Sequence, residues 1–218
     1  EFRRVLFRSV ESTKKITNAM GLVATSKLRK CRKELSINEQ YLEIAEKTMK
    51  SLARISEEKL TTSYFDGNDG NYKLYIIITS DTGLCAGYNN NVVAFLDSLI
   101  KDDKDNCKII SVGSKGISYL RRNGLETIDE YVDIPDIPTI KEVKLVYEKA
   151  LKLFVSAEVS EVNVVYTEFI SPIKQEVKSE KLLPVERAVG EVGEQIVEPD
   201  LKTVLTDSLD IYLKGKLR

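Results

Sequence analysis

Apolar residues recur every three or four positions along residues 10–58, and this repeat predicts one long helix. The stretch contains no proline, and only Gly21 interrupts its run of good helix formers. A helix of this length would measure about 70 Å, which is too long for the side of a small domain. Packing on its own domain is one alternative, but we expect most of the helix to pair with a partner helix. Two lines of residues with a spacing of seven form the a/d seam of a coiled coil: Leu28, Leu35, Leu42 and Met49, and Ala24, Cys31, Asn38, Ala45 and Leu52.

The pattern changes after the turn-forming sequence DGNDGN at 66–71, where strands and helices begin to alternate. This alternation predicts βαβ units and therefore an α/β fold with a mostly parallel sheet. Strands are predicted at 72–79, 108–112, 125–132 and 161–169, with an extended edge strand at 173–184. Helices are predicted between them at 89–101, 114–123 and 139–156.

The chain ends in a further helical pattern at 198–218. Pro199 and Asp200 suit its first turn, and the apolar stripe continues to the last residues. We therefore expect the beginning of a longer helix that pairs with the N-terminal one. The expected organisation is an atypical or non-native segment at 1–9, a coiled-coil helix at 10–60, a linker at 61–71, an α/β domain at 72–185, an acidic flexible loop at 186–197 and a truncated helix at 198–218.

The segment ITSDTGLCAGYNNNV at 78–92 passes from an apolar strand through a Gly-rich turn into a helix, as many nucleotide-binding loops do. It could hold a phosphate, present Cys85 as a nucleophile, or serve as a structural turn. Gly83 and Gly87 do not have the spacing of a dinucleotide or P-loop motif, and no lysine follows them. The three asparagines at 89–91 suit helix capping and turn formation better than phosphate binding. The pattern favours a structural turn with Cys85 as a small buried thiol.

Composition narrows the chemistry further. The 218 residues include 33 basic and 34 acidic side chains, three separated cysteines and no histidine. The cysteine pattern is not a disulfide framework, and the absence of histidine removes His-based triads, most zinc sites and a base for Cys85. No apolar run approaches the roughly 20 residues that span a bilayer. We predict no catalytic, cofactor-binding or metal-binding residues, and no transmembrane insertion.

Positive charge is concentrated on the long helix. Residues 12–33 contain seven cations and no acidic residue. Such a stretch could bind nucleic acid, acidic lipid or an acidic protein surface. It has no aromatic residue for base stacking, and Ile16, Met20 and Val23 run beside the cations instead. This combination favours a protein socket with an acidic rim, with a nucleic-acid-binding module as the alternative.

These segments together resemble the γ subunit of F-type ATP synthase. KKITNAMGLVATSKLRK at 14–30 resembles the family's N-terminal K-I-T-x-A-M-x-x-V-A-x-x-K-L-R motif, and TSDTGLCAGYNNNV at 79–92 resembles its T-S-D-R-G-L-C-G-G-F-N-x-N motif. VGSKG at 112–116 is similar to its V-G-x-K-G. The resemblance extends through VVYTEFISPIKQE, KLLP and EPDLKTVL, and it covers the chain from about residue 10 to its end.

The resemblance implies a non-catalytic rotor subunit of the F1 sector that couples proton flow to ATP synthesis. Its partners would be the α and β subunits, the ε subunit and the c-ring, with no nucleic acid and no cofactor. It would lie on the cytoplasmic face of the bacterial plasma membrane as a peripheral subunit. The implied fold is a Rossmann-like domain flanked by a long N-terminal coiled-coil helix and a C-terminal helix, of which only the start is present here.

Several residues are candidates for subunit contacts on this basis. Ser80, Asp81 and Thr82 would form a contact loop of the stalk. Thr82 replaces an arginine of the motif and Ala86 a glycine; the second change is minor if φ at residue 86 is negative. The expected contacts with the α/β ring are Lys15, Ile16, Thr17, Met20, Val23, Lys27, Leu28 and Arg29, with Lys30, Arg32 and Lys33 added by their charge.

Overall fold

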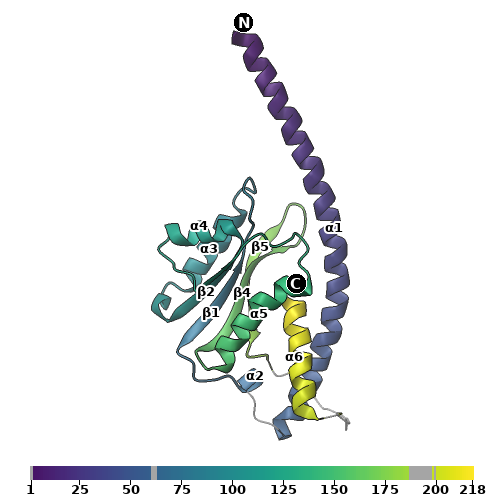
Figure 1. Ribbon diagram of the computed structural model, residues 1–218, viewed down its shortest axis with the longest axis vertical. Coiled ribbons are helices and arrows are strands. Elements are labelled where there is room, and N and C mark those ends of the chain that lie inside the picture. The colour runs from purple at the N-terminus through teal and green to yellow at the C-terminus, as the bar shows by residue number, and fades with distance from the viewer. Residues whose placement is uncertain (1, 60–62, 187–197, 199) are drawn as a thin grey trace. The chain divides into compact units, whose positions relative to one another are not determined.

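The computed structural model describes residues 2–59, 63–186, 198 and 200–218. The chain divides into two compact units, Glu1–Tyr41 and Leu42–Arg218. Helix α1, Phe2–Lys59, runs through both units, and every other element belongs to the second (Figure 1). The structure thus begins α1 at Phe2, within the segment that the sequence pattern set apart. Most of the predicted acidic loop, and residues 60–62 of the predicted linker, lie outside the described residues.

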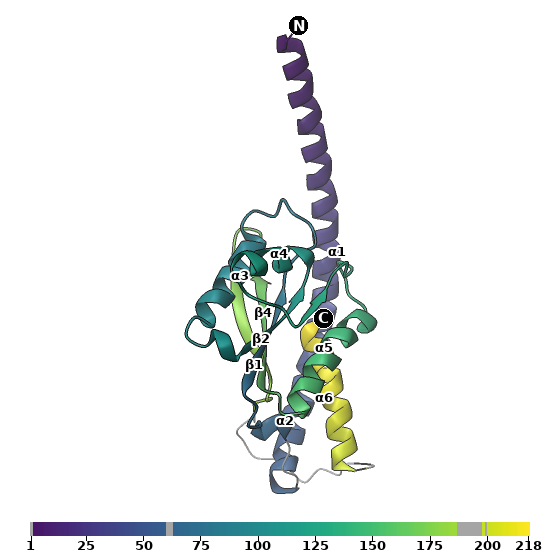
Figure 2. The ribbon, with the colours of Figure 1, turned by 60° about the vertical axis from the view of Figure 1, so that its left-hand side comes forward.

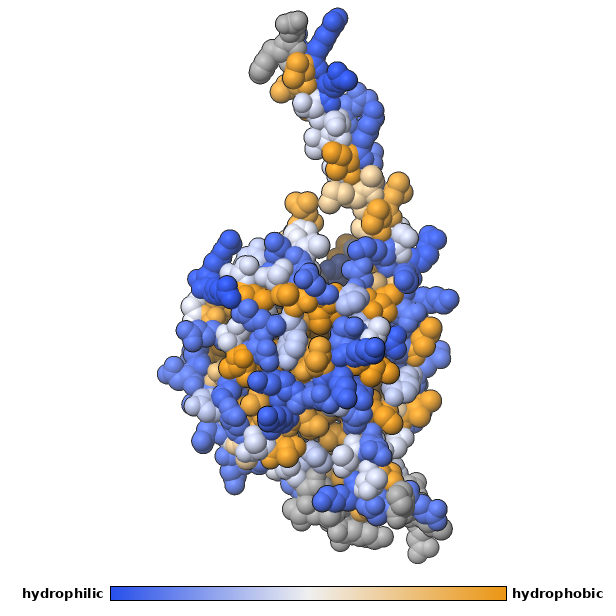
Figure 3. Space-filling view, viewed as in Figure 1, coloured by the Kyte–Doolittle hydropathy of each residue, from blue (hydrophilic) through white to orange (hydrophobic). Residues whose placement is uncertain are grey.

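The first unit is a single stretch of α1 whose side chains are mostly exposed. Its threonines at 13, 17 and 25 donate hydrogen bonds to the carbonyl oxygens four residues earlier, so they remain satisfied within the helix. Large apolar side chains, including Phe7, Ile16 and Leu22, face solvent. Figure 3 shows apolar side chains exposed beside charged ones along this helix. A helix with so little buried surface gains its stability from partners rather than from its own packing.

The second unit contains a five-stranded sheet with the order β3-β2-β1-β4-β5. Strands β1 (Tyr72–Ile78), β2 (Cys107–Val112), β3 (Asp129–Tyr131) and β4 (Val159–Phe169) are parallel, and β5 (Gln175–Leu183) pairs antiparallel with β4 at the edge. β1 reads as an almost continuous apolar run because it lies at the centre and is covered on both faces. The α/β fold with a mostly parallel sheet is confirmed.

Helices cover both faces of the sheet. On one face, α3 (Tyr88–Leu99) and α4 (Ser114–Arg122) pack on alternate strand residues such as Ile77 and Val165. On the other face lie α5 (Ile140–Val155) and, beside it, α6 (Leu201–Leu217) (Figure 2); residues of both helices share a core cluster with Ile76 and Val164. The short helices α2 (Ser63–Asp66) and η1 (Lys104–Asn106) lie in connections. Successive residues of a strand therefore alternate between two core clusters, one on each face of the sheet, because successive side chains of a strand point to opposite faces.

The end of α1 is part of the larger core cluster. Its buried side chains belong to the same cluster as those of α6, and the ribbons of this part of α1 and of α6 lie side by side in Figures 1 and 2. The contact explains the apolar periodicity of both segments, and it confirms that a C-terminal helix packs against the N-terminal one. The shared members are Ala45, Met49, Leu52 and Ala53 from α1, and Leu205, Leu209, Tyr212 and Leu213 from α6.

Most element boundaries differ from the sequence pattern by a few residues, and two of the differences have a clear physical cause. β3 covers Asp129–Tyr131 rather than residues 125–132, because the Leu125 amide closes the end of α4 by bonding the Leu120 carbonyl oxygen at 3.0 Å. α6 begins at Leu201 because the Asp200 carboxylate caps it, accepting a hydrogen bond from the Thr203 amide at 2.9 Å. None of the helices described here is both long and apolar enough to cross a membrane.

Candidate functional site

The loop after β1 is held by hydrogen bonds to the neighbouring strand and helix. Thr79 continues the ladder, with its amide 2.9 Å from the Val112 carbonyl oxygen, and its hydroxyl donates to the same oxygen at 2.9 Å. The same hydroxyl accepts from the Gly116 amide in the first turn of α4 at 3.0 Å. A Cβ at Gly116 would lie 2.5 Å from this hydroxyl, and one at Gly113 would lie 2.4 Å from the Thr79 carbonyl oxygen. Both glycines are therefore required for close packing.

The N-terminus of α4 has no amides left for a phosphate. The Ser114 amide donates to the Asp81 carboxylate at 2.8 Å, and the Lys115 amide donates to the Ser80 carbonyl oxygen at 3.1 Å. With the Gly116 amide bonded to Thr79, the first three amides of the helix are satisfied by the preceding loop. The Asp81 carboxylate occupies the position that an anion would take at a helix N-terminus.

Asn89 joins the two halves of the loop. Its side-chain oxygen accepts from the Ser80 amide at 2.8 Å, and its side-chain nitrogen donates to the Cys85 sulfur at 3.0 Å. Of the two roles expected for the asparagines, Asn89 therefore serves the turn and not the cap of α3, whose N-cap is Gly87. Cys85 is half-buried in the loop rather than fully buried beside the sheet. The buried polar side chain is Asn89, whose bonds hold the loop closed.

The tip of the loop has left-handed backbone at two residues other than glycine, Leu84 with φ of 63° and Ala86 with φ of 49°. The condition under which the alanine would be a minor change is therefore not met, because φ at residue 86 is positive. A side chain in this region is disfavoured by roughly 1–2 kcal/mol. The loop keeps this conformation because the contacts at both of its ends fix it.

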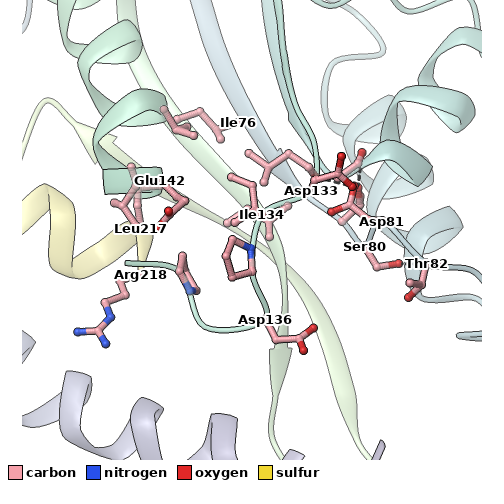
Figure 4. A pocket seen from close by; sticks show the side chains of 18 of the residues that line it. Ile76, Ser80, Asp81, Thr82, Asp133, Ile134, Asp136, Glu142, Leu217 and Arg218 are labelled. Carbon is pink, nitrogen blue, oxygen red and sulfur yellow. Dashed lines mark hydrogen bonds between the residues drawn. The ribbon is translucent and has the colours of Figure 1, made fainter. Parts of the chain in front are cut away.

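A cavity of about 670 Å³ opens on the α5 side of the sheet, at the carboxyl ends of β1 and β2 (Figure 4). Within the part of the chain that the structure describes, its lining includes the apolar Ile76 and Leu217, the acidic Asp81, Asp133, Asp136 and Glu142, and a single cation, Arg218. Glu142 is engaged in the capping box of α5, where bonds from the Thr139 side chain and backbone lower its carboxyl pKa. Several carboxylates disfavour a phosphate, although the position is where α/β folds usually bind nucleotides. Among the described residues, no group of His, Cys, Asp or Glu side chains could hold a metal ion.

The residues predicted for subunit contacts fall into three groups. All of those predicted to meet the α/β ring, from Lys15 to Lys33, are exposed on α1. Ser80 and Asp81 are half-buried by the loop contacts, whereas Thr82 is exposed. Along the predicted seam, exposure decreases towards the second unit: Ala24 and Leu35 are exposed, Cys31, Asn38 and Leu42 are half-buried, and Ala45, Met49 and Leu52 are buried.

The sequence patterns missed a polar cluster centred on Lys216. Its ammonium group pairs with Glu46 of α1 and Glu180 of β5, and its side chain is only 14% exposed. A second cluster on α6 joins Asp210 to Tyr147 of α5 and to Lys214. One signal was present: Leu205, Leu209, Tyr212 and Lys216 follow the helical spacing of the buried stripe, so a lysine occupies a core-facing position.

Comparisons with known proteins agree along the whole chain. A family model described as ATP synthase matches residues 4–218. The ATP synthase gamma chain of Clostridium botulinum strain Eklund 17B is 58% identical over 211 residues, and that of Clostridium beijerinckii is 53% identical over 211 residues. Each alignment covers 97% of this chain and 75% of the relative, so the chain spans about three quarters of their length.

The fold is also found among solved structures. A chain of the Tetrahymena thermophila mitochondrial ATP synthase central stalk and c-ring superposes with a TM-score of 0.56 at 21% identity, covering 83% of this chain and 89% of that one. A chain of the Euglena gracilis mitochondrial ATP synthase rotor superposes with a TM-score of 0.51 at 17% identity, covering 85% and 80%. At such identities the likeness concerns the fold. The family model and the sequence relatives decide the assignment: the chain belongs to the ATP synthase gamma chain family.

Proposed function

We propose that this chain is the rotor of the F1 sector, a non-catalytic subunit that couples proton flow through the membrane sector to ATP synthesis in the β subunits. The observation that carries the proposal is the gamma-chain identity of 58% over 97% of the chain. The loop after β1 supports it, because its hydrogen bonds occupy the first three amides of α4, where a nucleotide phosphate would bind. With the family known, a nucleic-acid-binding module is no longer needed to explain the basic helix.

The exposed face of α1 around Ile16, Met20 and Val23 is the part that we assign to the ring of α and β subunits. Each of these side chains is at least half exposed, and burying it in a socket would contribute about 1 kcal/mol. The surrounding cations would meet acidic side chains of the ring, above all in a loop of the β subunit. Exposed ion pairs are individually weak. The helix could therefore turn within such a socket without being locked to one position.

The remaining partners follow from the same role. The ε subunit and the c-ring would contact the α/β domain, and Ser80, Asp81 and Thr82 would form a contact loop of the stalk. The seam from Ala24 to Leu52 would pair with a C-terminal helix in the complete rotor. The subunit would be peripheral, on the cytoplasmic face of the plasma membrane.

Co-expression with α and β subunits tests the ring contact. In a full-length version of the subunit, changing Ile16 and Val23 together to Asp should reduce its retention by the ring at least tenfold, because both apolar contacts are lost and charge is placed in the socket. The matched control changes Asn18 and Thr25 to Asp, which adds the same charge on the opposite side of the helix at 3.6 residues per turn.

Three outcomes decide the matter. Retention of the unchanged subunit and of the control, with loss of the double Ile16/Val23 variant, supports the assigned face. Equal retention of both variants contradicts this face but not the rotor role. Failure of the unchanged subunit to co-purify with α and β contradicts the proposed function itself.

A further inference from the structure

Lys216 connects three elements that are far apart in the sequence. Its ammonium nitrogen lies 2.8 Å from a carboxylate oxygen of Glu46 on α1, and it also pairs with Glu180 on β5. The two partners are about one-third exposed, whereas the lysine is mostly buried. Burial alone would lower the pKa of Lys216, but the hydrogen bonds to Glu180 and Glu46 outweigh it and the pKa is raised. The lysine is therefore charged whenever the protein is folded near neutral pH.

The connection continues into the sheet. The second carboxylate oxygen of Glu180 lies 3.4 Å from the Tyr166 hydroxyl on β4, which donates to it. The Lys216 nitrogen also lies 5.8 Å from the centre of the Tyr212 ring. A line of polar contacts thus runs from α1 through α6 to the two antiparallel strands. A cavity of about 360 Å³ borders the cluster, lined by Glu46, Glu180 and Lys216 among others.

Polar and apolar contacts resist sliding differently. The core contacts between α1, α6 and the sheet are apolar, and such contacts carry no directional preference. A charge-assisted hydrogen bond depends strongly on distance and angle. A torsional load between the helices and the sheet would therefore be opposed most directly by the bonds of Lys216, because they cross from one to the other.

Loss of the Lys216 ammonium group would turn the attraction within this cluster into a repulsion between Glu46 and Glu180. Glu46 and Glu180 are held within hydrogen-bonding distance of the same nitrogen, so their carboxylates lie close together with one cation between them. Without that cation, two like charges would face each other in a partly buried site. The lysine is thus the member on which the cluster depends.

We propose that Lys216 is a positioning residue for rotation: it makes the α/β domain turn with helices α1 and α6 as one body. The inference rests on the proposed rotor function, and it deepens that function by naming the residue that transmits load between the parts of the rotor. Lys214 offers a matched contrast on the same helix. It pairs with Asp210 one turn earlier and lies 5.4 Å from the Tyr147 ring of α5, so these contacts join α6 to α5 rather than to α1 or the sheet.

The first test uses this chain alone and does not depend on its role in the synthase. Urea unfolding is measured for Lys216→Met, Glu46→Gln and the double variant. Each change alters the unfolding equilibrium constant by some factor. The factor for the double variant should be at least tenfold smaller than the product of the factors for the two single variants, because the two groups share one contact. Additive effects would overturn the proposed link.

The second test uses a full-length subunit in the assembled synthase. Lys216→Met should leave assembly and ATP hydrolysis in place but lower the number of protons pumped per ATP hydrolysed by at least half. Lys216→Arg should restore the ratio because it keeps the charge and can bond both carboxylates. Lys214→Met should keep the ratio unchanged, although it also removes a lysine from α6.

The outcomes separate the two proposals. If Lys216→Met pumps as efficiently as Lys214→Met, Lys216 does not transmit load and the inference is wrong. If Lys216→Met does not fold, Glu180→Gln is measured instead, because it keeps the shape of the site and removes the charge of the carboxylate. Pumping by Glu180→Gln that is as efficient as pumping by Lys214→Met would then overturn the inference. If the unchanged subunit does not assemble with α and β, the rotor function fails instead, while the unfolding cycle still decides whether the link exists.

Discussion

Replacing Ala86 by glycine should stabilise the chain, although it removes a side-chain atom. Ala86 has a φ of 49°, where a non-glycine residue is disfavoured by roughly 1–2 kcal/mol. Its side chain is exposed, so the change forfeits little packing. Glycine adds conformational freedom to the unfolded chain, which offsets about 0.4–1 kcal/mol of the gain. We expect a net increase of about 0.5–1 kcal/mol in the free energy of unfolding for Ala86→Gly.

Urea unfolding followed by far-ultraviolet circular dichroism measures this change. With a slope of about 2–3 kcal/mol per molar urea, the midpoint should rise by roughly 0.2–0.5 M. Two other positions serve as internal standards. Ala157, with φ of 56° and an exposed side chain after α5, should give a similar gain on change to glycine. Gly124, with φ of 70° and open space around its Cβ position, should give a loss of about 1 kcal/mol on change to alanine.

The comparison among these variants isolates the loop. A lower midpoint for Ala86→Gly, together with the expected shifts at Ala157 and Gly124, would refute the reasoning that the tip of the loop is strained. Equal midpoints for the unchanged protein and for Ala86→Gly, Ala157→Gly and Gly124→Ala would refute the use of backbone conformation to predict stability changes at these three sites.

Three further predictions concern the loop, the core and acid stability. Asn89→Ala should lower the free energy of unfolding by about 2 kcal/mol, because it leaves the Ser80 amide without its acceptor. The control Asn90→Ala, at an exposed position, should change that free energy by less than about 0.5 kcal/mol in urea unfolding. Similar losses for both variants would argue against the Asn89 contacts. Met49→Ala should lower the free energy of unfolding by about 2–5 kcal/mol in the same measurement, because the Met49 side chain is only 1% exposed. The control Met20→Ala, at an exposed position on the same helix, should lower it far less. A small effect at Met49 would contradict the packing of α1 in the core. The pKa of Glu142 is lower in the folded chain than in the unfolded one, so its contribution to the free energy of unfolding is present above the ordinary pKa of about 4.3 and is lost as the pH falls through the lowered value. Glu142→Gln should therefore flatten the pH dependence of the unfolding free energy between about pH 5 and 3. An unchanged slope would argue against the capping contact.

Local pattern was sufficient where one segment determines its own environment. The apolar run at 72–79 predicted the strand β1, and Pro199 with Asp200 predicted a helix start within a few residues of where α6 begins. The same kind of pattern failed at β3, because Leu125 is apolar for a different reason: it closes the end of α4. A strand residue and a helix-closing residue look alike when only polarity is read.

Contacts between distant residues were beyond a local pattern. The asparagine run predicted a capping or turn residue, but it did not identify the partner of Asn89, Ser80, which lies nine residues earlier in the loop. Lys216 appeared as one more lysine in a mixed-charge helix, yet its partners come from α1 and β5. The absence of a nucleotide motif, in contrast, was predicted from the glycine spacing and the missing lysine. The hydrogen bonds of the α4 amides are consistent with that prediction.

The burial of Met49 and Ala53 against α6 also has a consequence for biosynthesis. These side chains leave the ribosome early, whereas Leu205 and Leu209, which share their core cluster, follow roughly 150 residues later. At about 5–20 residues per second, the apolar side of the first helix waits on the order of ten seconds or more for its intramolecular partner. During that interval it is open to chaperones and to the same helix of other nascent chains. Although α1 is made before α6, this side of α1 is enclosed only after α6 has been made, and the yield of native subunit depends on how that interval is protected.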